Sequence, residues 1–190
     1  RRQTLRAARA MSACNCAAWS PDGALLATAH ESGICVWDAV LGRALRVFSG
    51  HGDRVRCVAW SRSGALLASA SDDHSIRLWD VSAGRLERVL SGHLGPVTSL
   101  AFSPDRRTLA SSSTDETVTL WDIETAAARP LLLESQHSSY VTCVAFSPDG
   151  QMLALGSAAG TISYWDLSTR KWLGDSDLGH SEFVESIAFS

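Results

Sequence analysis

Short apolar stretches separated by turn residues run along the whole chain. In residues 50–91 they lie near 55–60, 65–70, 75–79 and 85–90. They are rich in Val, Leu, Ile and small residues, which is typical of β-strands. The first two are apolar on both faces, as expected for a sheet that other sheets cover on both sides. Because no stretch shows helical periodicity, the pattern predicts an all-β protein with four antiparallel strands in each unit.

Two dipeptides repeat with the period of these units. Trp-Asp begins at positions 37, 79, 121 and 165, in steps of 42, 42 and 44 residues. Gly-His occurs at 50–51, 92–93 and 179–180, with Gln-His at 136–137, so the histidines are spaced by 42, 44 and 43 residues. Two independent markers therefore share one period, which is the sequence signature of a repeat protein.

A third marker has the same phase. Ser-Pro-Asp-Gly at 20–23 recurs as Ser-Arg-Ser-Gly at 61–64, Ser-Pro-Asp-Arg at 103–106 and Ser-Pro-Asp-Gly at 147–150. Pro presets the backbone of the second turn position, and Asp or Gly completes a tight turn. A Ser-Pro pair could also be a kinase target, but only a turn explains why the motif recurs once per unit.

Gly-His followed by Trp-Asp, on a period of about 40 to 45 residues, resembles the WD40 repeat over essentially the whole chain. The resemblance implies a β-propeller, in which four-stranded blades pack radially around a central channel. Four complete blades are expected at about 11–49, 50–91, 92–135 and 136–178, with a partial preceding strand in 1–10 and the start of a fifth blade in 179–190. Since propellers of this family commonly close with seven blades, we expect the chain to be part of a seven-bladed ring and a fragment of a longer protein.

The resemblance also implies that a buried network of His, Ser or Thr, Asp and Trp side chains fixes each blade. The second and third blades carry the full set, with 22 residues from His to Asp and 6 from Asp to Trp in both. The expected tetrads are His51, Ser69, Asp73 and Trp79 in one blade, and His93, Ser111, Asp115 and Trp121 in the other. A fully bonded buried network makes a structure rigid, whereas a half-bonded one is costly.

The first and fourth blades depart from this pattern. Their partial tetrads are Thr28, Glu31 and Trp37 in the first blade, and His137 and Trp165 in the fourth. Ala10 occupies the His position of the first blade, and Leu155 and Ala159 occupy the Ser and Asp positions of the fourth. We therefore expect no full network in either blade.

The Ser, His and Asp residues of the tetrads also invite comparison with a catalytic triad. Against that interpretation, the set recurs once per blade and no Gly-x-Ser-x-Gly elbow presents the serine. The histidines lack metal-ligand spacing, and the chain has no phosphate-binding loop. We therefore expect no catalytic, cofactor-binding or metal-binding residue and no enzymatic activity.

The cysteines are interpreted as packing residues. Cys16, Cys57 and Cys143 fall at one repeat position, where the other blades have Ser99 and Ser186. Core packing explains a position that takes small residues better than metal or redox chemistry does. Because five cysteines at irregular spacing give no disulfide framework, a reducing compartment is expected, the cytoplasm and/or the nucleus.

Composition narrows the class of partner. The 190 residues are 45% apolar and 19% charged, which is enough apolar mass for a core. The net charge of -3 offers no basic surplus for nucleic acid, and no apolar run approaches the roughly 20 residues that span a bilayer. Residues 1–21 hold four arginines and no acid, so a transit peptide is conceivable, although a start within a longer protein is favoured. We expect proteins or peptides as partners, rather than nucleic acid, a membrane or a small-molecule substrate.

Loops at one end of the blades are the expected partner surface, because side chains there are not needed for the core. These are the loop before the first strand and the loop between the second and third strands, where partners of the family often dock. The candidates are Arg54, Arg56, Asp72, Thr98, Thr114, Tyr140, Thr142, Phe183 and Glu185. The arginines and Asp72 would form a mixed-charge patch, and the two aromatic residues would supply contact area. Taken singly, each residue is explained at least as well by an ordinary solvated loop.

The expected function is a non-catalytic scaffold or adaptor that assembles multiprotein complexes through a propeller face. Two alternatives remain open: a regulatory or sensor propeller within a larger signalling enzyme, and a propeller subunit of an RNA-processing or ribosome-assembly particle. Two specialised roles of the family lack their signature residues. Histone-tail readers carry a phenylalanine clamp where this chain has Arg56, Thr98, Thr142 and Glu185. Ubiquitin-ligase receptors often carry an arginine where it has Val40, Ser82, Glu124 and Ser168.

Overall fold

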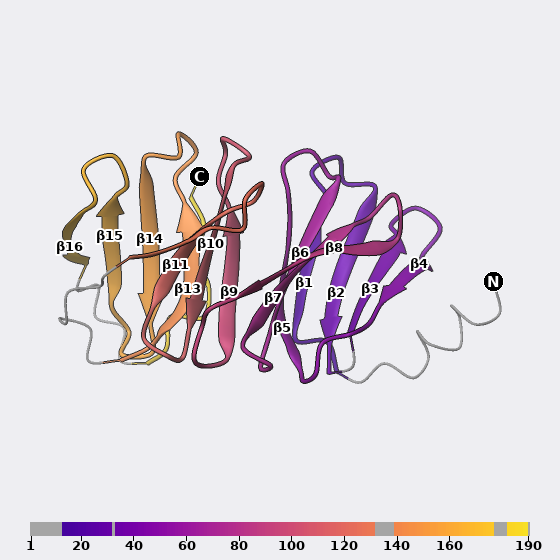
Figure 1. Ribbon diagram of the computed structural model, residues 1–190, viewed down its shortest axis with the longest axis horizontal. Coiled ribbons are helices and arrows are strands. Elements are labelled where there is room, and N and C mark those ends of the chain that lie inside the picture. The colour runs from indigo at the N-terminus through magenta and orange to yellow at the C-terminus, as the bar shows by residue number, and fades with distance from the viewer. Residues whose placement is uncertain (1–12, 32, 132–138, 177–181, 190) are drawn as a thin grey trace. The chain divides into compact units, whose positions relative to one another are not determined.

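The computed structural model describes residues 13–31, 33–131, 139–176 and 182–189 (Figure 1). These residues form β-strands and turns, and the strands make four separate four-stranded sheets. Within each sheet, strands that follow one another in sequence are antiparallel neighbours. The predicted all-β fold, with four antiparallel strands in each sequence repeat, is therefore confirmed. No helix that could cross a membrane occurs in the part of the chain that the structure describes.

The strands belong to two compact units, residues 1–92 and 93–190, each of which holds two sheets, or blades. In the first unit, blade 1 consists of β1 Cys16–Trp19, β2 Leu25–His30, β3 Gly33–Asp38 and β4 Arg43–Phe48, and blade 2 of β5 Val55–Trp60, β6 Leu66–Ser71, β7 Ser75–Asp80 and β8 Arg85–Ser91. In the second unit, blade 3 consists of β9 Val97–Phe102, β10 Thr108–Ser113, β11 Val118–Asp122 and β12 Ala128–Leu131, and blade 4 of β13 Val141–Phe146, β14 Met152–Ser157, β15 Ile162–Asp166 and β16 Lys171–Ser176. The four strands predicted in residues 50–91 agree with blade 2 to within one residue at each end.

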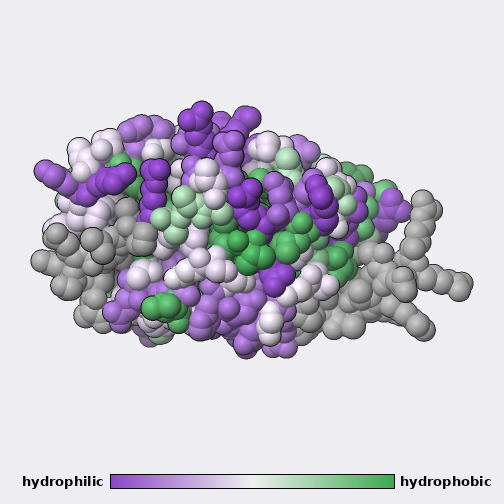
Figure 2. Space-filling model, in the orientation of Figure 1, coloured by the Kyte–Doolittle hydropathy of each residue, from purple (hydrophilic) through white to green (hydrophobic). Residues whose placement is uncertain are grey.

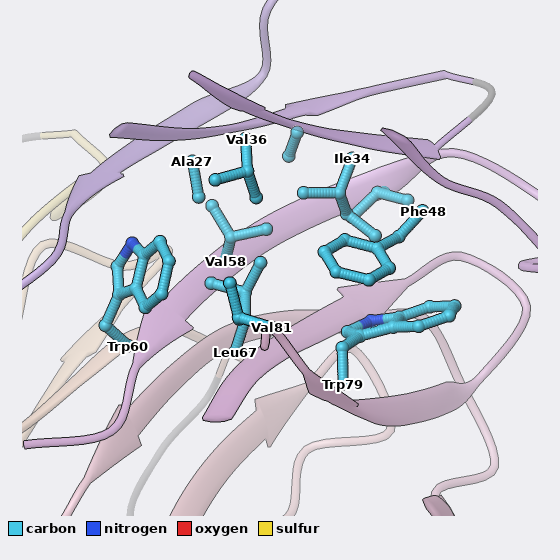
Figure 3. Close-up of a cluster of buried hydrophobic side chains, with 11 residues drawn as sticks. Ala27, Ile34, Val36, Phe48, Val58, Trp60, Leu67, Trp79 and Val81 are labelled. Carbon is cyan, nitrogen blue, oxygen red and sulfur yellow. The ribbon is translucent and has the colours of Figure 1, made fainter. Parts of the chain in front are cut away.

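The core of the first unit lies between its two sheets (Figure 3). Side chains of β2, β3 and β4 meet side chains of blade 2, and they include Ala27, Ile34, Val36, Phe48, Val58, Leu67 and Trp79. The Phe48 and Trp79 rings contribute an aromatic pair with centroids 5.1 Å apart. Every residue of β6 after Leu66 is buried. A strand covered on both sides has no wet face, which explains why its sequence does not alternate.

The second unit has a core of the same kind. Side chains of blades 3 and 4 form a buried cluster of Ala110, Val118, Val141, Val144, Leu153, Leu155 and Trp165. As in blade 2, the second strand of each blade here is buried almost throughout. The packing between blades, rather than within one sheet, therefore removes most of the apolar surface from water.

The recurring Ser-Pro-Asp-Gly motif forms the tight turn that its residues predict. The Ser20 hydroxyl donates to Asp22 Oδ1 at 2.6 Å, and the Gly23 amide donates to the Ser20 carbonyl at 2.9 Å. Gly23 has a φ of 70°, a region that glycine enters without steric cost. In blade 3 the same position holds Arg106 with a φ of 66°, so this turn keeps its shape without glycine.

Residues 183–189 do not form the strand that the sequence predicts. Among the described strands none pairs with this segment, so it has no ladder of hydrogen bonds. It nevertheless lies against blade 4, because the Val184 amide donates to the Ser157 carbonyl at 3.1 Å and the Thr142 hydroxyl donates to the Val184 carbonyl. The fifth blade and the seven-bladed ring stay predictions, and the preceding strand predicted in 1–10 lies outside the described residues.

Candidate functional site

The structure brings the four predicted tetrad residues of blade 2 together. His51 Nδ1 lies 2.8 Å from Asp73 Oδ2, and His51 Nε2 lies 2.7 Å from Ser69 Oγ. The Trp79 indole N–H donates to the same Ser69 oxygen at 2.8 Å. The His51 side chain is 1% exposed, so both ring nitrogens are sealed within the blade. The chain of bonds runs from the loop before β5, through β6, to β7, and therefore ties three parts of the blade together.

Blade 3 repeats this arrangement. His93 Nδ1 lies 3.0 Å from Asp115 Oδ2, and His93 Nε2 lies 2.7 Å from Ser111 Oγ. Trp121 donates to Ser111 Oγ at 2.8 Å. Since a carboxylate can only accept, Nδ1 carries the hydrogen in both tetrads. Burial lowers the pKa of His51 and His93, although the carboxylates raise it, and a neutral ring then accepts the serine proton at Nε2.

The aspartates of the tetrads also hold the loops in place. Burial raises the pKa of Asp115, but hydrogen bonds from Thr117 and from the Leu94 amide outweigh it and lower the pKa to about 2. In Asp73, bonds from Ser75 and the Gly52 amide likewise outweigh burial and hold the pKa well below its usual range. Each carboxylate therefore clamps the loop before the first strand to the turn between the second and third strands.

These pKa shifts predict that acid destabilises both blades. The buried imidazoles have a lower pKa when folded than when unfolded, so the unfolded chain binds their protons first and stability falls as the pH drops below about 6.5. The aspartates have lowered folded pKa values, and their contribution is lost as the pH falls further, below about 4. Urea midpoints measured between about pH 7.5 and pH 5 should decline, and H93Q should flatten the decline for the second unit. An unchanged slope in H93Q would contradict the assignment to this ring.

Blade 1 closes its network with a histidine that the sequence pattern did not indicate. The Trp37 indole donates to Thr28 Oγ1 at 2.8 Å, and His30 Nε2 lies 2.9 Å from the same oxygen. His30 is 7% exposed, whereas Glu31, the predicted counterpart of the tetrad aspartate, lies exposed after the strand. The residue Ala10 lies outside the described part of the chain. The alternation of β2 provides the missed signal, because Thr28 and His30 are two apart and share one face.

Among the residues that the structure describes, blade 4 has the least complete network. Leu155 replaces the tetrad serine and is 1% exposed. As a result the buried Trp165 Nε1 has no hydrogen-bond partner among the described residues. His137, the other predicted member, lies outside them. Ser163 of β15 instead donates to Asp175 of β16, so this polar bond joins the third and fourth strands of the blade.

The predicted mixed-charge patch exists in the loops of blade 2, but two of its members neutralise each other. Arg56 Nε and Asp72 Oδ1 form an ion pair, with side chains 39% and 16% exposed. The Asp72 amide also donates to the Arg54 carbonyl at 2.9 Å, which joins the two loops through their backbones. Arg54 itself is exposed. Of the three predicted patch residues, Arg54 therefore keeps the most accessible charge.

Two predicted face residues of the second unit are bonded between neighbouring segments. Thr98 Oγ1 donates to the Val141 carbonyl of the next blade at 2.9 Å. One repeat later, Thr142 Oγ1 donates to the Val184 carbonyl. In the first unit, Asn15 Nδ2 donates in the same way to the Val55 carbonyl at 3.0 Å. In blades 1, 3 and 4 this repeat position therefore links the first strand to the segment one repeat later.

The remaining candidates differ in how far they are exposed. Thr114 and Tyr140 are half-buried, and their backbones join loops through bonds of 3.0 Å to Pro96 and Ala158. Phe183 is 57% exposed, and Glu185 is exposed as well. The face seen in Figure 2 carries hydrophobic patches among hydrophilic areas. Because exposed aromatic side chains are common anchors at protein interfaces, Phe183 is the strongest of these four as a contact residue.

Comparison with known protein families identifies the family of this chain. Residues 13–190 match the family model described as the IFT122 first beta-propeller. The chain belongs to this family of WD40-type β-propellers. A search of curated proteins gives no match. The WD40-type propeller predicted from the repeats is thereby confirmed.

The IFT122-type propeller exposes one loop residue that sequence reasoning missed. Leu94 follows the Gly-His pair of blade 3 and is 86% exposed. Its amide is fixed by Asp115 Oδ2 at 2.7 Å, so the tetrad holds an apolar side chain out into solvent. The sequence does contain a signal for Leu94, because blade 2 has a glycine, Gly52, at the same repeat position.

The polar side chains of the tetrads are engaged within the blades. The Ser, His and Asp side chains of the tetrads bond to one another rather than opening onto a cleft. Among residues whose placement is described, no three His, Cys, Asp or Glu side chains gather as metal ligands would. The IFT122-type blades present loops that the buried tetrads hold in place.

Proposed function

We propose that this propeller is a non-catalytic scaffold that assembles protein complexes through the loop ends of its blades. A loop end is defined as the loop before the first strand together with the turn between the second and third strands. The observation that carries the proposal is the way each tetrad aspartate clamps these two loops. Rigid loops lose little conformational entropy on binding, which favours affinity.

The exposed groups at the loop ends support proteins or peptides as partners. The first unit presents Arg54, and the second presents Leu94, Phe183 and Glu185. An arginine and apolar or aromatic anchors are the groups that contribute most to protein interfaces. The chain's net charge of -3 gives no electrostatic drive toward nucleic acid, and we propose neither a membrane nor a small molecule as ligand. A reducing compartment, the cytoplasm and/or the nucleus, fits the five cysteines, which form no disulfide.

Affinity purification of the full-length protein, with identification of the co-purifying chains, tests the proposal. We expect R54E in the first unit, or L94S with F183S in the second, to reduce recovery of the partner by at least about tenfold, because an anchor residue contributes more than about 1.4 kcal/mol. These residues are exposed, so the substitutions should leave the urea midpoint unchanged.

The matched control is V40S. Val40 is 88% exposed in the turn between β3 and β4, at the opposite end of blade 1. Recovery with V40S should equal that of the wild type. Equal losses in V40S and the loop-end variants, or no loss in any of them, would overturn the proposal.

A further inference from the structure

Two cysteine sulfurs from different blades of the first unit converge on one backbone oxygen. Cys16 Sγ lies 3.9 Å from the Val58 carbonyl oxygen, and Cys57 Sγ lies 3.8 Å from the same atom. Cys16 belongs to β1 and Cys57 to β5, which are the first strands of blades 1 and 2. Both residues are only partly buried, so a small reagent can reach them.

The repeat explains why these thiols meet. Cys16 pairs with Ala29, Cys57 with Ala70 and Cys143 with Gly156, so the three cysteines occupy the same register of the first strand. Adjacent blades place this register side by side. In the second unit the neighbour of Cys143 is a serine, Ser99, whose hydroxyl accepts from the Val144 amide at 3.3 Å. The first unit therefore pairs thiol with thiol, whereas the second pairs thiol with hydroxyl.

We propose that Cys16 and Cys57 are a redox-active dithiol that a small disulfide, such as oxidised glutathione, converts into a disulfide between blades 1 and 2. This site is independent of the loop ends and of the scaffold function. The packing role expected for the small-residue position still applies to the buried Cys143 and the half-buried Ser99. At Cys16 and Cys57 the same repeat position carries a thiol that takes part in the exchange.

The exchange proceeds in two balanced steps. The Cys16 thiolate attacks one sulfur of oxidised glutathione, forms a mixed disulfide and expels one glutathione thiolate. Cys57 then gives up its proton, attacks the Cys16 sulfur, closes the Cys16–Cys57 bond and expels the second glutathione. Two protein thiols are oxidised and one disulfide is reduced to two thiols. In a reducing compartment such a bond would be transient and regulatory rather than structural.

The electrostatics give the order of attack. A hydrogen bond from Cys57 lowers the pKa of Cys16 to about 6, against the effect of burial and with help from a backbone bond at Val58. Burial raises the pKa of Cys35 to about 11 and also raises the pKa of Cys143. Cys16 is therefore the thiolate at neutral pH. Allowing for its weaker intrinsic nucleophilicity, it should react about three to six times faster at pH 7 than an unperturbed thiol.

Mass spectrometry of the whole chain after incubation with oxidised glutathione tests the proposal. The wild type should lose two hydrogens and yield a linked Cys16–Cys57 peptide, while Cys143 stays a thiol. In C57S the second step is blocked, so Cys16 should retain one glutathionyl group. In C16S the disulfide should be absent. Serine occurs naturally at this repeat position, as Ser99 and Ser186, so both variants should fold.

Cys14 is the thiol best placed to compete with Cys16 and Cys57 for the reagent, because it is exposed and its sulfur lies 3.3 Å from the Cys16 carbonyl oxygen. Since the proposed exchange does not involve Cys14, the linked Cys16–Cys57 peptide should form equally in C14S. A disulfide that includes Cys14, or Cys16 and Cys57 that both remain thiols while Cys14 is glutathionylated, would overturn the proposal. Glutathionylation of Cys143 as fast as that of Cys16 would do the same.

Discussion

S69A is expected to lower the unfolding free energy of the first unit by about 3 kcal/mol. Ser69 is 0% exposed, and its oxygen serves both His51 Nε2 and the Trp79 indole N–H. Removing the oxygen leaves two buried polar groups without a partner, and each orphan costs about 1–3 kcal/mol. Urea unfolding followed by circular dichroism measures the loss, and hydrogen exchange of the β5–β8 amides assigns it to this unit.

The control for this prediction is S82A. Ser82 is exposed, and its hydroxyl donates to Asp80 Oδ1 at 2.7 Å in a solvated turn. We expect S82A to change stability by less than about 0.5 kcal/mol. If S69A were as mild as S82A, the tetrad would contribute little to the blade, and its role as the brace of the loops would be untenable.

The two tryptophans of the second unit should respond differently to the same substitution. Trp121 is 2% exposed and donates to Ser111 Oγ, whereas Trp165 is 6% exposed and its N–H has no partner among the described residues. W121F removes a satisfied bond, but W165F removes an orphaned donor along with the same apolar area. The loss of stability should therefore be about 2 kcal/mol greater in W121F.

This pair of variants contains its own control, because both indoles lie in the same unit and at the same repeat position. The cost of the smaller ring is common to both and cancels in the comparison. Urea midpoints under identical conditions give the difference directly. Equal losses would show that the Trp165 N–H is satisfied after all and that Leu155 does not impair the network of blade 4.

Much of the fold could be predicted because it rests on local, repeated signals. The apolar stretches of residues 50–91 and the turn at Ser20 are short-range features, and the 42-residue spacing of the Trp-Asp pairs sets the phase of each blade. The tetrads of blades 2 and 3 were implied by the resemblance to the WD40 repeat, whose residues both blades carry at the same intervals. The structure adds the distances and the burial that make these networks effective.

What the sequence could not provide depends on contacts between segments that lie far apart. The bonds of Asn15 and Thr98 to neighbouring blades span 40 and 43 residues, and nothing local distinguishes these side chains from free loop residues. The Arg56–Asp72 ion pair likewise removes charge that composition alone assigns to the surface. His30 could not be predicted as a member of the network because it lies on the second strand of its blade, whereas the family pattern places the histidine in the loop before the first strand.

The four blades differ in how completely their tetrads are formed. Blades 2 and 3 have complete tetrads, blade 1 substitutes His30, and in blade 4 the Trp165 N–H has no partner among the described residues. Local unfolding should therefore begin in blade 4 within the second unit, because its polar core is the least satisfied. The loop ends of blades 2 and 3 are correspondingly the best-braced sites for a partner.

Hydrogen exchange of the full-length protein, alone and with its purified partner, tests the central claim most directly. We expect binding to protect loop-end amides in residues 50–54 and 72–74, or in 93–96 and 114–116, while the opposite turns at 39–42 and 82–84 exchange at unchanged rates. Protection confined to those opposite turns, with no change at any loop end, would contradict the claim that the propeller binds proteins through the loops its tetrads hold in place.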